Sequence, residues 1–195
     1  MSTTNGYCTL AELRSSMGIT DATDVTDDAH LERAIEAASR AIDDECGRRF
    51  FLDSSATARY YTAEDGDHLR IDDVGSSTSF AVATDSDGDR TYESTWAATD
   101  YDMLPDNASV KGLPWTALEV TPNGVYSFPT VRRGCKITAY WGWPAVPKPI
   151  KSAAIIQAMR YFKRKDAIFG VMGTAETGQM VLPALDPDVK RMNSP

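Results

Sequence analysis

Apolar positions near the start of the chain recur with the helical spacing of three to four residues. Thr9 and Glu12 have the spacing of a capping box, in which each side chain accepts a hydrogen bond from the other residue's backbone N–H. We therefore expect a first helix from Thr9 that ends at Gly18. A second helix is expected from Asp28 and should stop at Gly47. Its apolar face is formed by Leu31, Ile35, Ala38 and Ile42.

A third apolar stretch follows a proline-rich segment near the C-terminus. Pro149 suits the first turn of a helix, because the missing N–H has no partner there. We expect this helix to run from Ile150 to about Phe169. Apolar residues cover most of its circumference, so it should pack against more than one surface. The small alanines of the second helix allow close approach, and the third helix is the obvious partner.

The middle of the chain, from Ala56 to Tyr140, changes to short alternating runs broken by Gly, Asp, Asn and Pro. This pattern is typical of antiparallel β-hairpins. We expect one hairpin around the turn 64–67 and a second around the turn 85–89. The strands expected to flank these two turns are 58–61 with 68–71 and 80–83 with 90–93, and further strands are expected at 101–104, 117–120 and 136–141.

These patterns together predict an α+β fold, a small helical bundle with an inserted antiparallel β domain. Residues 1–55 should form the N-terminal part of the helical core and residues 56–144 the β domain. Residues 145–173 should supply the long helix that completes the core. Residues 174–195 cannot bury a core of their own, so they are expected to be a docking tail.

Composition and cysteine usage narrow the class of protein. The chain has 195 residues, of which 42% are hydrophobic and 25% are charged, which is ordinary for a globular protein. No basic leader and no apolar run of membrane-spanning length is present, so we expect a cytosol-like compartment and no membrane partner. Cys8, Cys46 and Cys135 are odd in number and widely spaced, so free thiols are favoured over disulfides or a zinc site.

The charge is divided unevenly along the chain. Residues 1–55 hold 5 basic and 11 acidic residues, residues 56–144 hold 7 and 13, and residues 145–195 hold 8 and 4. The first two segments therefore have a net charge of −6 each, and the last has +4. Such polarity suits docking between neighbouring copies or onto an acidic partner, although a solvated basic helix face would explain it equally well.

Every candidate for reaction or metal chemistry is weaker than a structural explanation. Asp85, Asp87 and Asp89 match the first acids of an EF-hand loop, but the required glycine is Arg90 and the twelfth position is Trp96. A hairpin turn is therefore favoured over a calcium site. His30 and His68 stand alone and are expected at the surface, and no glycine-rich phosphate loop is present. We expect no catalytic residue, no metal and no cofactor.

Aromatic residues near two arginines offer a different possibility. Tyr140, Trp141, Trp143 and Phe128, with Arg132 and Arg133 nearby, could form a stacking platform for bases or sugars. The favoured alternative is that the two tryptophans fasten the β domain to the helices.

Several short anchors, taken in order, resemble the head-to-tail adaptor (connector) proteins of tailed bacteriophages, particularly actinobacterial-type siphophages. No single anchor is specific, but their order and spacing cover most of the chain. The anchors are Thr9-Leu10-Ala11-Glu12-Leu13, the stretch 34–50 ending in Cys-Gly-Arg-Arg-Phe, the hairpin 84–93, Trp141-Gly142-Trp143-Pro144, Tyr161-Phe162-Lys163-Arg164, Phe169-Gly170-Val171 and Leu185-Asp186-Pro187-Asp188-Val189.

The resemblance implies a structural virion protein and not an enzyme. Its members form a ring of about a dozen copies that joins the portal protein to the tail, or to a stopper or tail-completion protein, and continues the channel for genomic DNA. DNA would pass through without sequence-specific binding. The resemblance thus places the chain in the neck of the virion, and in the host cytoplasm during assembly. A carbohydrate- or nucleic-acid-binding β module, or another connector component such as a stopper, remains the alternative.

Two segments are candidates for contacts with other subunits or with the portal. The end of the late helix carries the strongest positive cluster in an acidic chain, and the tail lacks a core. The candidate residues are Arg160, Lys163, Arg164, Leu185, Asp186, Val189 and Arg191.

Overall fold

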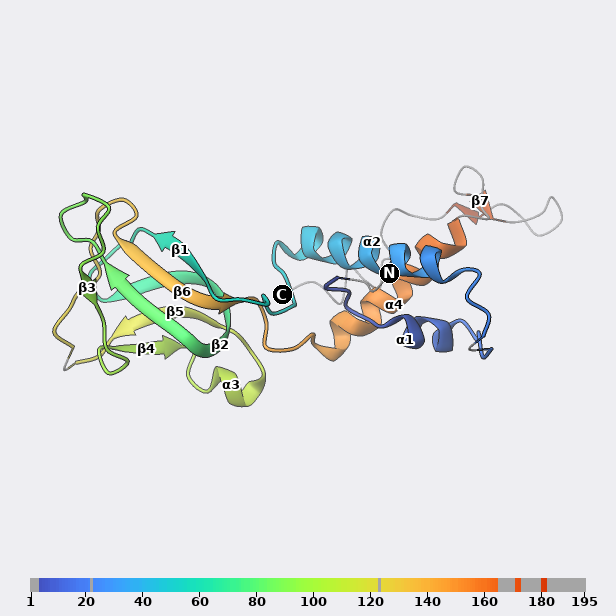
Figure 1. The fold of residues 1–195 in the computed structure, drawn as a ribbon, viewed down its shortest axis with the longest axis horizontal. Coiled ribbons are helices and arrows are strands. Elements are labelled where there is room, and N and C mark those ends of the chain that lie inside the picture. Colours follow the sequence, from blue (N-terminus) through green and yellow to red (C-terminus); the bar gives the residue numbers. More distant parts are fainter. Residues whose placement is uncertain (1–3, 22, 123, 165–170, 173–179, 182–195) are drawn as a thin grey trace. The chain divides into compact units, whose positions relative to one another are not determined.

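The computed structural model describes residues 4–21, 23–122, 124–164, 171–172 and 180–181. The chain divides into two compact units, one of residues 1–50 with 146–195 and one of residues 51–145. We call them the helical unit and the β unit, and each is described by itself (Figure 1). Helices and an antiparallel sheet are both present, so the expected mixture of α and β structure is confirmed.

The first helix of the helical unit, α1 (Leu10–Ser16), begins as its sequence predicts. The Glu12 backbone N–H donates to Thr9 Oγ1 at 3.2 Å, and the Thr9 backbone N–H donates to Glu12 Oε2 at 2.8 Å. Both halves of the capping box are therefore formed. Gly18 follows the last turn with φ +74°, the left-handed conformation that ends a helix at little cost only for glycine.

The second helix, α2 (Asp28–Cys46), also has the predicted bounds. Gly47 caps it with φ +63°, and its buried residues include the predicted apolar face. It contacts the late helix, α4 (Lys148–Lys163), and α1 contacts both. The close approach of α2 and α4 is made possible by small buried residues on each: Ala34 and Ala38 on α2, and Ala153, Ala154 and Ala158 on α4.

Helix α4 starts two residues earlier than the sequence predicts. Pro147 is its N-cap and Pro149 lies in the first turn, where its missing N–H costs nothing. In the described residues the helix ends at Lys163, with Arg164 as the C-cap. The rest of the expected helix, residues 165–169, lies outside the described residues.

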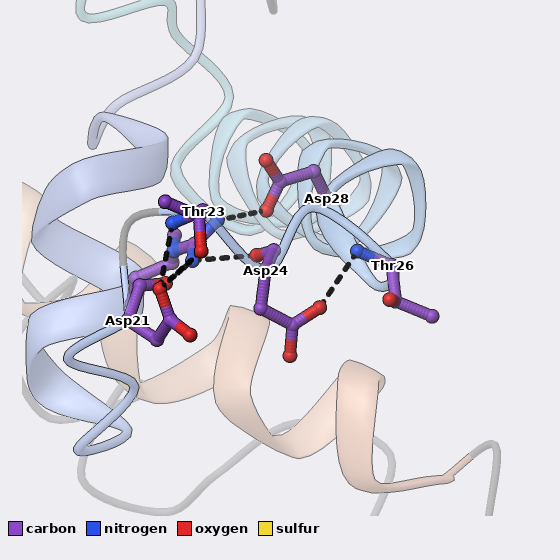
Figure 2. A network of polar contacts seen from close by, with 6 residues as sticks. Asp21, Thr23, Asp24, Thr26 and Asp28 are labelled. Atoms are coloured by element: carbon purple, nitrogen blue, oxygen red, sulfur yellow. Dashed lines mark hydrogen bonds and ion pairs between the residues drawn. The ribbon is translucent and has the colours of Figure 1, made fainter.

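One arginine holds the loop between α1 and α2, whose polar contacts around Asp21, Asp24 and Asp28 are drawn in Figure 2. The Arg14 guanidinium donates to Asp28 Oδ1 at 2.5 Å, to the Asp24 carbonyl at 2.7 Å and to the Asp21 carbonyl. The loop also closes its own turns, because Asp21 and Asp24 accept from the backbone N–H groups of Thr23 and Thr26. The loop that the sequence predicted from its Asp and Thr content is therefore an ordered polar network.

Tyr7 connects three parts of the helical unit from a fully buried position. Its hydroxyl donates to Asp43 Oδ1 near the end of α2 and accepts from the Phe50 backbone N–H at 2.8 Å. Its own backbone N–H donates to Ser39 Oγ at 3.0 Å. Burial and the bond to Asp43 raise the pKa of the Tyr7 hydroxyl, so it remains a neutral donor.

The β unit contains an antiparallel sheet with strand order β1-β6-β2-β5-β4, and β3 pairs with β2. A short helix, α3, connects β4 to β5, and outside this unit β7 pairs with β8. The bounds are β1 Thr57–Tyr61, β2 His68–Thr84, β3 Ser94–Thr95, β4 Tyr101–Leu104, α3 Ala108–Lys111, β5 Trp115–Val120, β6 Cys135–Trp141, β7 Val171–Met172 and β8 Met180–Val181.

The long strand β2 serves both halves of the sheet. Its first part pairs with β5, and its second part pairs with β6. The register shifts between Arg70 and Val74, between Val74 and Ser76, and again before Ala81. Such irregularities bend a strand. The segments 68–71 and 80–83, which the sequence predicted as separate strands, are therefore the two ends of one long, bent strand.

The first predicted hairpin does not form. The turn near Asp65 is present, because its carboxylate accepts from the backbone N–H groups of Asp67 and His68. However, β1 pairs with β6, with Tyr61 opposite Cys135, and does not pair with the start of β2. The turn therefore connects β1 to β2, two strands that are not neighbours in the sheet. A local turn pattern cannot distinguish this from a hairpin.

The second predicted hairpin is displaced. The turn 85–89 follows β2, but the returning strand is β3, with Thr84 opposite Ser94, and not residues 90–93. Arg90 has φ +76°, and its backbone N–H donates to Asp85 Oδ2 at 2.8 Å. The side chain of Asp85 thus organises a longer loop, and pairing resumes only after it.

The core of the β unit is built around buried aromatic rings. Trp141 is 0% exposed, its Nε1 donates to the Thr57 carbonyl at 2.8 Å, and the Arg59 guanidinium lies 4.4 Å from its ring. Trp96 stacks on Phe128 with ring centroids 4.5 Å apart. These contacts assign Trp141 to the interior of the β unit, and its role in fastening this unit to the helices stays a prediction.

The two ends of the β unit are bonded to each other. Leu52 and Gly142 form an antiparallel bridge, and the Asp53 backbone N–H donates to the Trp141 carbonyl at 2.8 Å. Gly142 has φ +107°, and a Cβ added there would lie 1.8 Å from the Phe51 carbonyl oxygen. The glycine of the Trp-Gly-Trp-Pro sequence is therefore required for this close approach.

Candidate interaction surfaces

The predicted basic cluster lies at the C-terminal end of α4. Arg160, Lys163 and Arg164 are spaced i, i+3 and i+4, so they share one side of the helix. Lys163 is exposed, whereas the two arginines are half-buried and also interact within the chain. The Arg164 guanidinium lies 5.6 Å from the Tyr161 ring. Three positive charges at a helix C-terminus are favourably placed in the field of the helix dipole.

A shallow hollow of about 240 Å³ lies beside this cluster, between α2 and α4. His30 and Arg33 come from the exposed side of α2, and Tyr161 and Phe162 come from α4. The structure thus brings a mainly apolar depression next to the end of α4. The other four predicted interface residues, Leu185, Asp186, Val189 and Arg191, lie outside the described residues.

The predicted aromatic platform is not formed as a group. Trp141 and Phe128 are buried in the core, with 0% and 2% exposure. Tyr140 and Trp143 are half-buried, and the Trp143 Nε1 donates to Asp73 Oδ2 at 3.0 Å. The rings expected to stack on bases or sugars therefore serve packing within the β unit, and this correction weakens the binding-module alternative.

A different group of aromatic and basic side chains, which we did not predict from the sequence, has two exposed members, Tyr60 and Arg133, and two half-buried ones, Tyr92 and Lys136. Tyr60 on β1 and Tyr92 lie with ring centroids 5.6 Å apart. The Arg133 guanidinium lies 4.6 Å from the Tyr60 ring, and Lys136 Nζ lies 5.7 Å from the Tyr92 ring. The Tyr92 hydroxyl donates to the Arg133 carbonyl at 2.8 Å. We call these four residues the cationic edge surface.

The cationic edge surface depends on a strand pairing that no local pattern reveals. Tyr60 and Lys136 are directly opposite each other in the β1–β6 ladder. Because residues 58–61 were expected to pair with 68–71, Tyr60 and Lys136 could not be placed together from the sequence. One sequence signal could have indicated this surface. The pair Arg132-Arg133 comes just before strand β6, and Lys136 is the second residue of that strand.

The acidic turn after β2 uses its carboxylates for its own backbone. Asp85 is buried, and its two oxygens accept from the N–H groups of Gly88 and Arg90 at 2.7 and 2.8 Å. Burial opposes ionisation of Asp85, but these two donors outweigh it and hold the pKa of the carboxyl below its usual range. Asp87 and Asp89 accept from nearby backbone N–H groups in the same way.

Carboxylate oxygens of Asp85, Asp87 and Asp89 lie within 4.8 Å of one another, close enough to hold a cation. Each of these carboxylates is engaged with the turn, so the geometry favours the hairpin-turn interpretation, and the absence of a metal remains a prediction.

The remaining titratable candidates lie as expected. His30 and His68 are exposed, and His68 Nε2 is 3.2 Å from Glu119 Oε1. All three cysteines are free thiols. Burial raises the pKa of Cys8 to about 11 and that of Cys135 to about 12, so neither is a reactive thiolate. In the part of the chain that the structure describes, no helix has the length and hydropathy needed to cross a membrane.

Comparison with solved structures shows the same fold in chains from the necks of GTA particles. One chain is from the neck of an empty GTA (gene transfer agent) particle computed with C6 symmetry, with 18% identity and a TM-score of 0.56. That match covers 98% of this chain and 92% of the other. A second chain is from the neck of a native GTA particle computed with C12 symmetry, with 19% identity, a TM-score of 0.53, and 94% and 86% of the two chains covered.

Comparison with protein families gives a match at the N-terminal part of the chain. Residues 7–74 match the model described as phage gp6-like head-tail connector protein. None of the curated proteins matches the chain. The matched region contains Tyr7, both capped helices and the first strand. The resemblance to head-to-tail connector proteins is thereby confirmed over residues 7–74.

Proposed function

We propose that this protein is a head-to-tail adaptor that forms a ring between the portal and the tail, or a stopper, and continues the DNA channel. The observation that carries the proposal is the family match over residues 7–74, the region that holds α1, α2 and their capping and Tyr7 contacts. In this proposal α1, α2 and α4 form the helical bundle of the adaptor core, and the β unit is the insertion. The protein acts in the virion neck after assembly in the host cytoplasm.

A ring of identical copies requires head-to-tail contacts, in which two different surfaces of each copy meet. The neck chains with the same fold come from particles computed with C6 and C12 symmetry. We propose that this chain also forms a ring of twelve copies. The function is then geometric and needs no catalytic group, in agreement with the turn role of the acidic loop and the neutral thiols.

Arg160, Lys163 and Arg164 are proposed to contact the portal or a neighbouring copy. Residues 145–195 have an excess of four positive charges in a chain whose net charge is −8, so this segment is attracted to an acidic surface. The tail residues Leu185, Asp186, Val189 and Arg191 belong to the same proposed contact. Genomic DNA is proposed to pass an acidic wall without sticking, because like charges oppose binding to its phosphates.

The direct test mixes the purified protein with the purified portal oligomer of the same phage and follows co-sedimentation and negative-stain images. The expected result is a stoichiometric extra ring on the portal. The triple variant R160E/K163E/R164E should lose this association, whereas the matched variant R70E, which reverses an exposed charge on β2, should retain it. No association between the folded natural chain and the portal would contradict the proposal and favour a stopper or another tail-side component.

A further inference from the structure

Basic residues of the β unit gather at one edge of an acidic body. Residues 51–145 contain 7 basic and 14 acidic residues. Four of the basic ones lie together at this edge, where the Arg90 guanidinium donates to the Arg132 carbonyl. The carboxylates of the turn 85–89 lie at the same edge, because the Asp85 backbone N–H donates to the Gly134 carbonyl at 2.8 Å. Arg90, Arg132 and Arg133 are exposed, and the Tyr60 ring is 42% exposed. Within the described residues the Arg133 and Lys136 charges lie against ring faces and form no ion pair, so they are available to a partner.

The opposite edge of the same sheet carries unbalanced negative charge. Asp102 on β4 lies directly opposite Glu119 on β5, which is an unfavourable cross-strand pair of like charges. Asp102 is exposed, and the Glu119 side chain is 46% exposed. His68 Nε2 lies 3.2 Å from Glu119 Oε1 on the other side. We call Asp102 and Glu119 the acidic edge surface.

The topology separates these two surfaces. β1 and β4 are the two ends of the strand order β1-β6-β2-β5-β4, and Figure 1 shows them on opposite sides of the β unit. Two acidic edge surfaces would repel each other, so a symmetric face-to-face dimer through that edge is disfavoured. A head-to-tail contact joins opposite charges and can repeat around a ring.

We propose that, in the assembled ring, the cationic edge surface of one copy contacts the acidic edge surface of the next copy. This inference rests on the ring role proposed above and adds the surface that sets the order and direction of neighbours. The tyrosine rings hold Arg133 and Lys136 in place, so less side-chain freedom is lost when the contact forms. A contact of exposed charges mainly fixes orientation and speeds association, and it weakens as salt rises.

Charge reversal at each edge tests whether the two edges contact each other in neighbouring copies. Variant A carries R133E/K136E, and variant B carries D102K/E119K. In either variant alone both edges have the same sign, so ring formation on the portal should fall at least about tenfold. In an equal mixture each A edge meets a B edge of opposite sign, so alternating rings should form again. A single chain with all four substitutions should also assemble. K111E, at an exposed residue of α3, is the matched control and should assemble normally.

The outcomes separate this inference from the ring role itself. Circular dichroism and thermal melting first establish that A and B are folded. Normal ring formation by A or B alone would overturn the edge contact and leave the adaptor role standing. Loss of assembly by A that neither B nor the fourfold variant restores would also overturn it, because the partner of the cationic edge would then be another protein or nucleic acid. Failure of the natural chain to form rings would instead contradict the proposed function.

Discussion

The helical unit and the β unit are stabilised by contacts of different range. In the helical unit the helix ends and the loop between α1 and α2 are fixed by contacts close in sequence, such as the Thr9–Glu12 capping box, the Gly47 cap and the Arg14 network. In the β unit they are distant, because β1 pairs with β6 and residue 51 meets residue 142. Local chemistry therefore sets the helix ends of one unit, whereas the strand pairing of the other depends on segments that meet only after the whole insertion has folded.

The largest effect is expected from Gly142→Ala, which disrupts a contact between two segments of the β unit that are far apart in the sequence. The new Cβ would lie 1.8 Å from the Phe51 carbonyl oxygen at a φ of +107°, so the ends of the unit must separate. We expect a loss of more than about 3 kcal/mol in the free energy of unfolding, measured by urea titration with tryptophan fluorescence.

Gly88→Ala provides the control for backbone strain alone. Gly88 also has a positive φ, of +84°, but no atom lies within 4 Å of the added Cβ. Its cost should be about 1–2 kcal/mol. Equal losses at the two positions would show that the close approach at Gly142 contributes nothing.

Tyr7→Phe tests the buried centre of the helical unit. Without the hydroxyl, the Phe50 N–H loses its acceptor and Asp43 loses a donor in a buried site. We expect a loss of about 1–3 kcal/mol. Hydrogen exchange should show faster opening of α2, while the amides of β6 keep their protection. Tyr126→Phe, at a 36% exposed ring, should change neither. Equal loss of protection in both units would contradict their separate stabilisation.

A smaller effect is expected from Arg14→Lys. A lysine ammonium cannot reach Asp28 Oδ1 and the two loop carbonyls at once, as the planar guanidinium does. The predicted loss is about 1 kcal/mol in the free energy of unfolding, with increased proteolysis between residues 20 and 28. Arg33→Lys, at an exposed position of α2, should leave both measurements unchanged. If the loop stays resistant to protease, Arg14 does not hold it.

The smallest effect concerns the pH dependence of the capping box. The Thr9 backbone N–H, followed by Lys151, lowers the pKa of Glu12 below its ordinary value of 4.5. The resulting stability is complete above pH 4.5 and is lost as the pH falls through the lower pKa of the folded state. The Glu12 side chain is 38% exposed, so the contribution should be below about 0.5 kcal/mol. Glu12→Gln should remove this part of the pH dependence, and an unchanged profile would exclude the box as its source.

The range of the contacts also explains what the sequence could predict. The start of α1 and the end of α2 follow from Thr9, Glu12 and Gly47, because these caps act within one helical turn. The partner of β1 could not be found from residues 58–61, since a turn near Asp65 is present whether or not a hairpin forms. The cluster of Arg160, Lys163 and Arg164 was predicted because the three lie on one helix. Tyr60 and Lys136 were missed because only strand pairing unites them.

The bridge between Leu52 and Gly142 has a consequence for the history of the chain. Because the entrance and exit of the β unit are bonded together, the whole insertion behaves toward the helical segments as a short closed loop. The entropy of closing a loop grows only slowly with its length, and here the inserted unit itself holds its ends together. Such a unit can be exchanged for another domain, or shortened to a few residues, with little cost to its host. The Trp-Gly-Trp-Pro sequence therefore marks a junction at which the chain could acquire a new module without redesign of its helices.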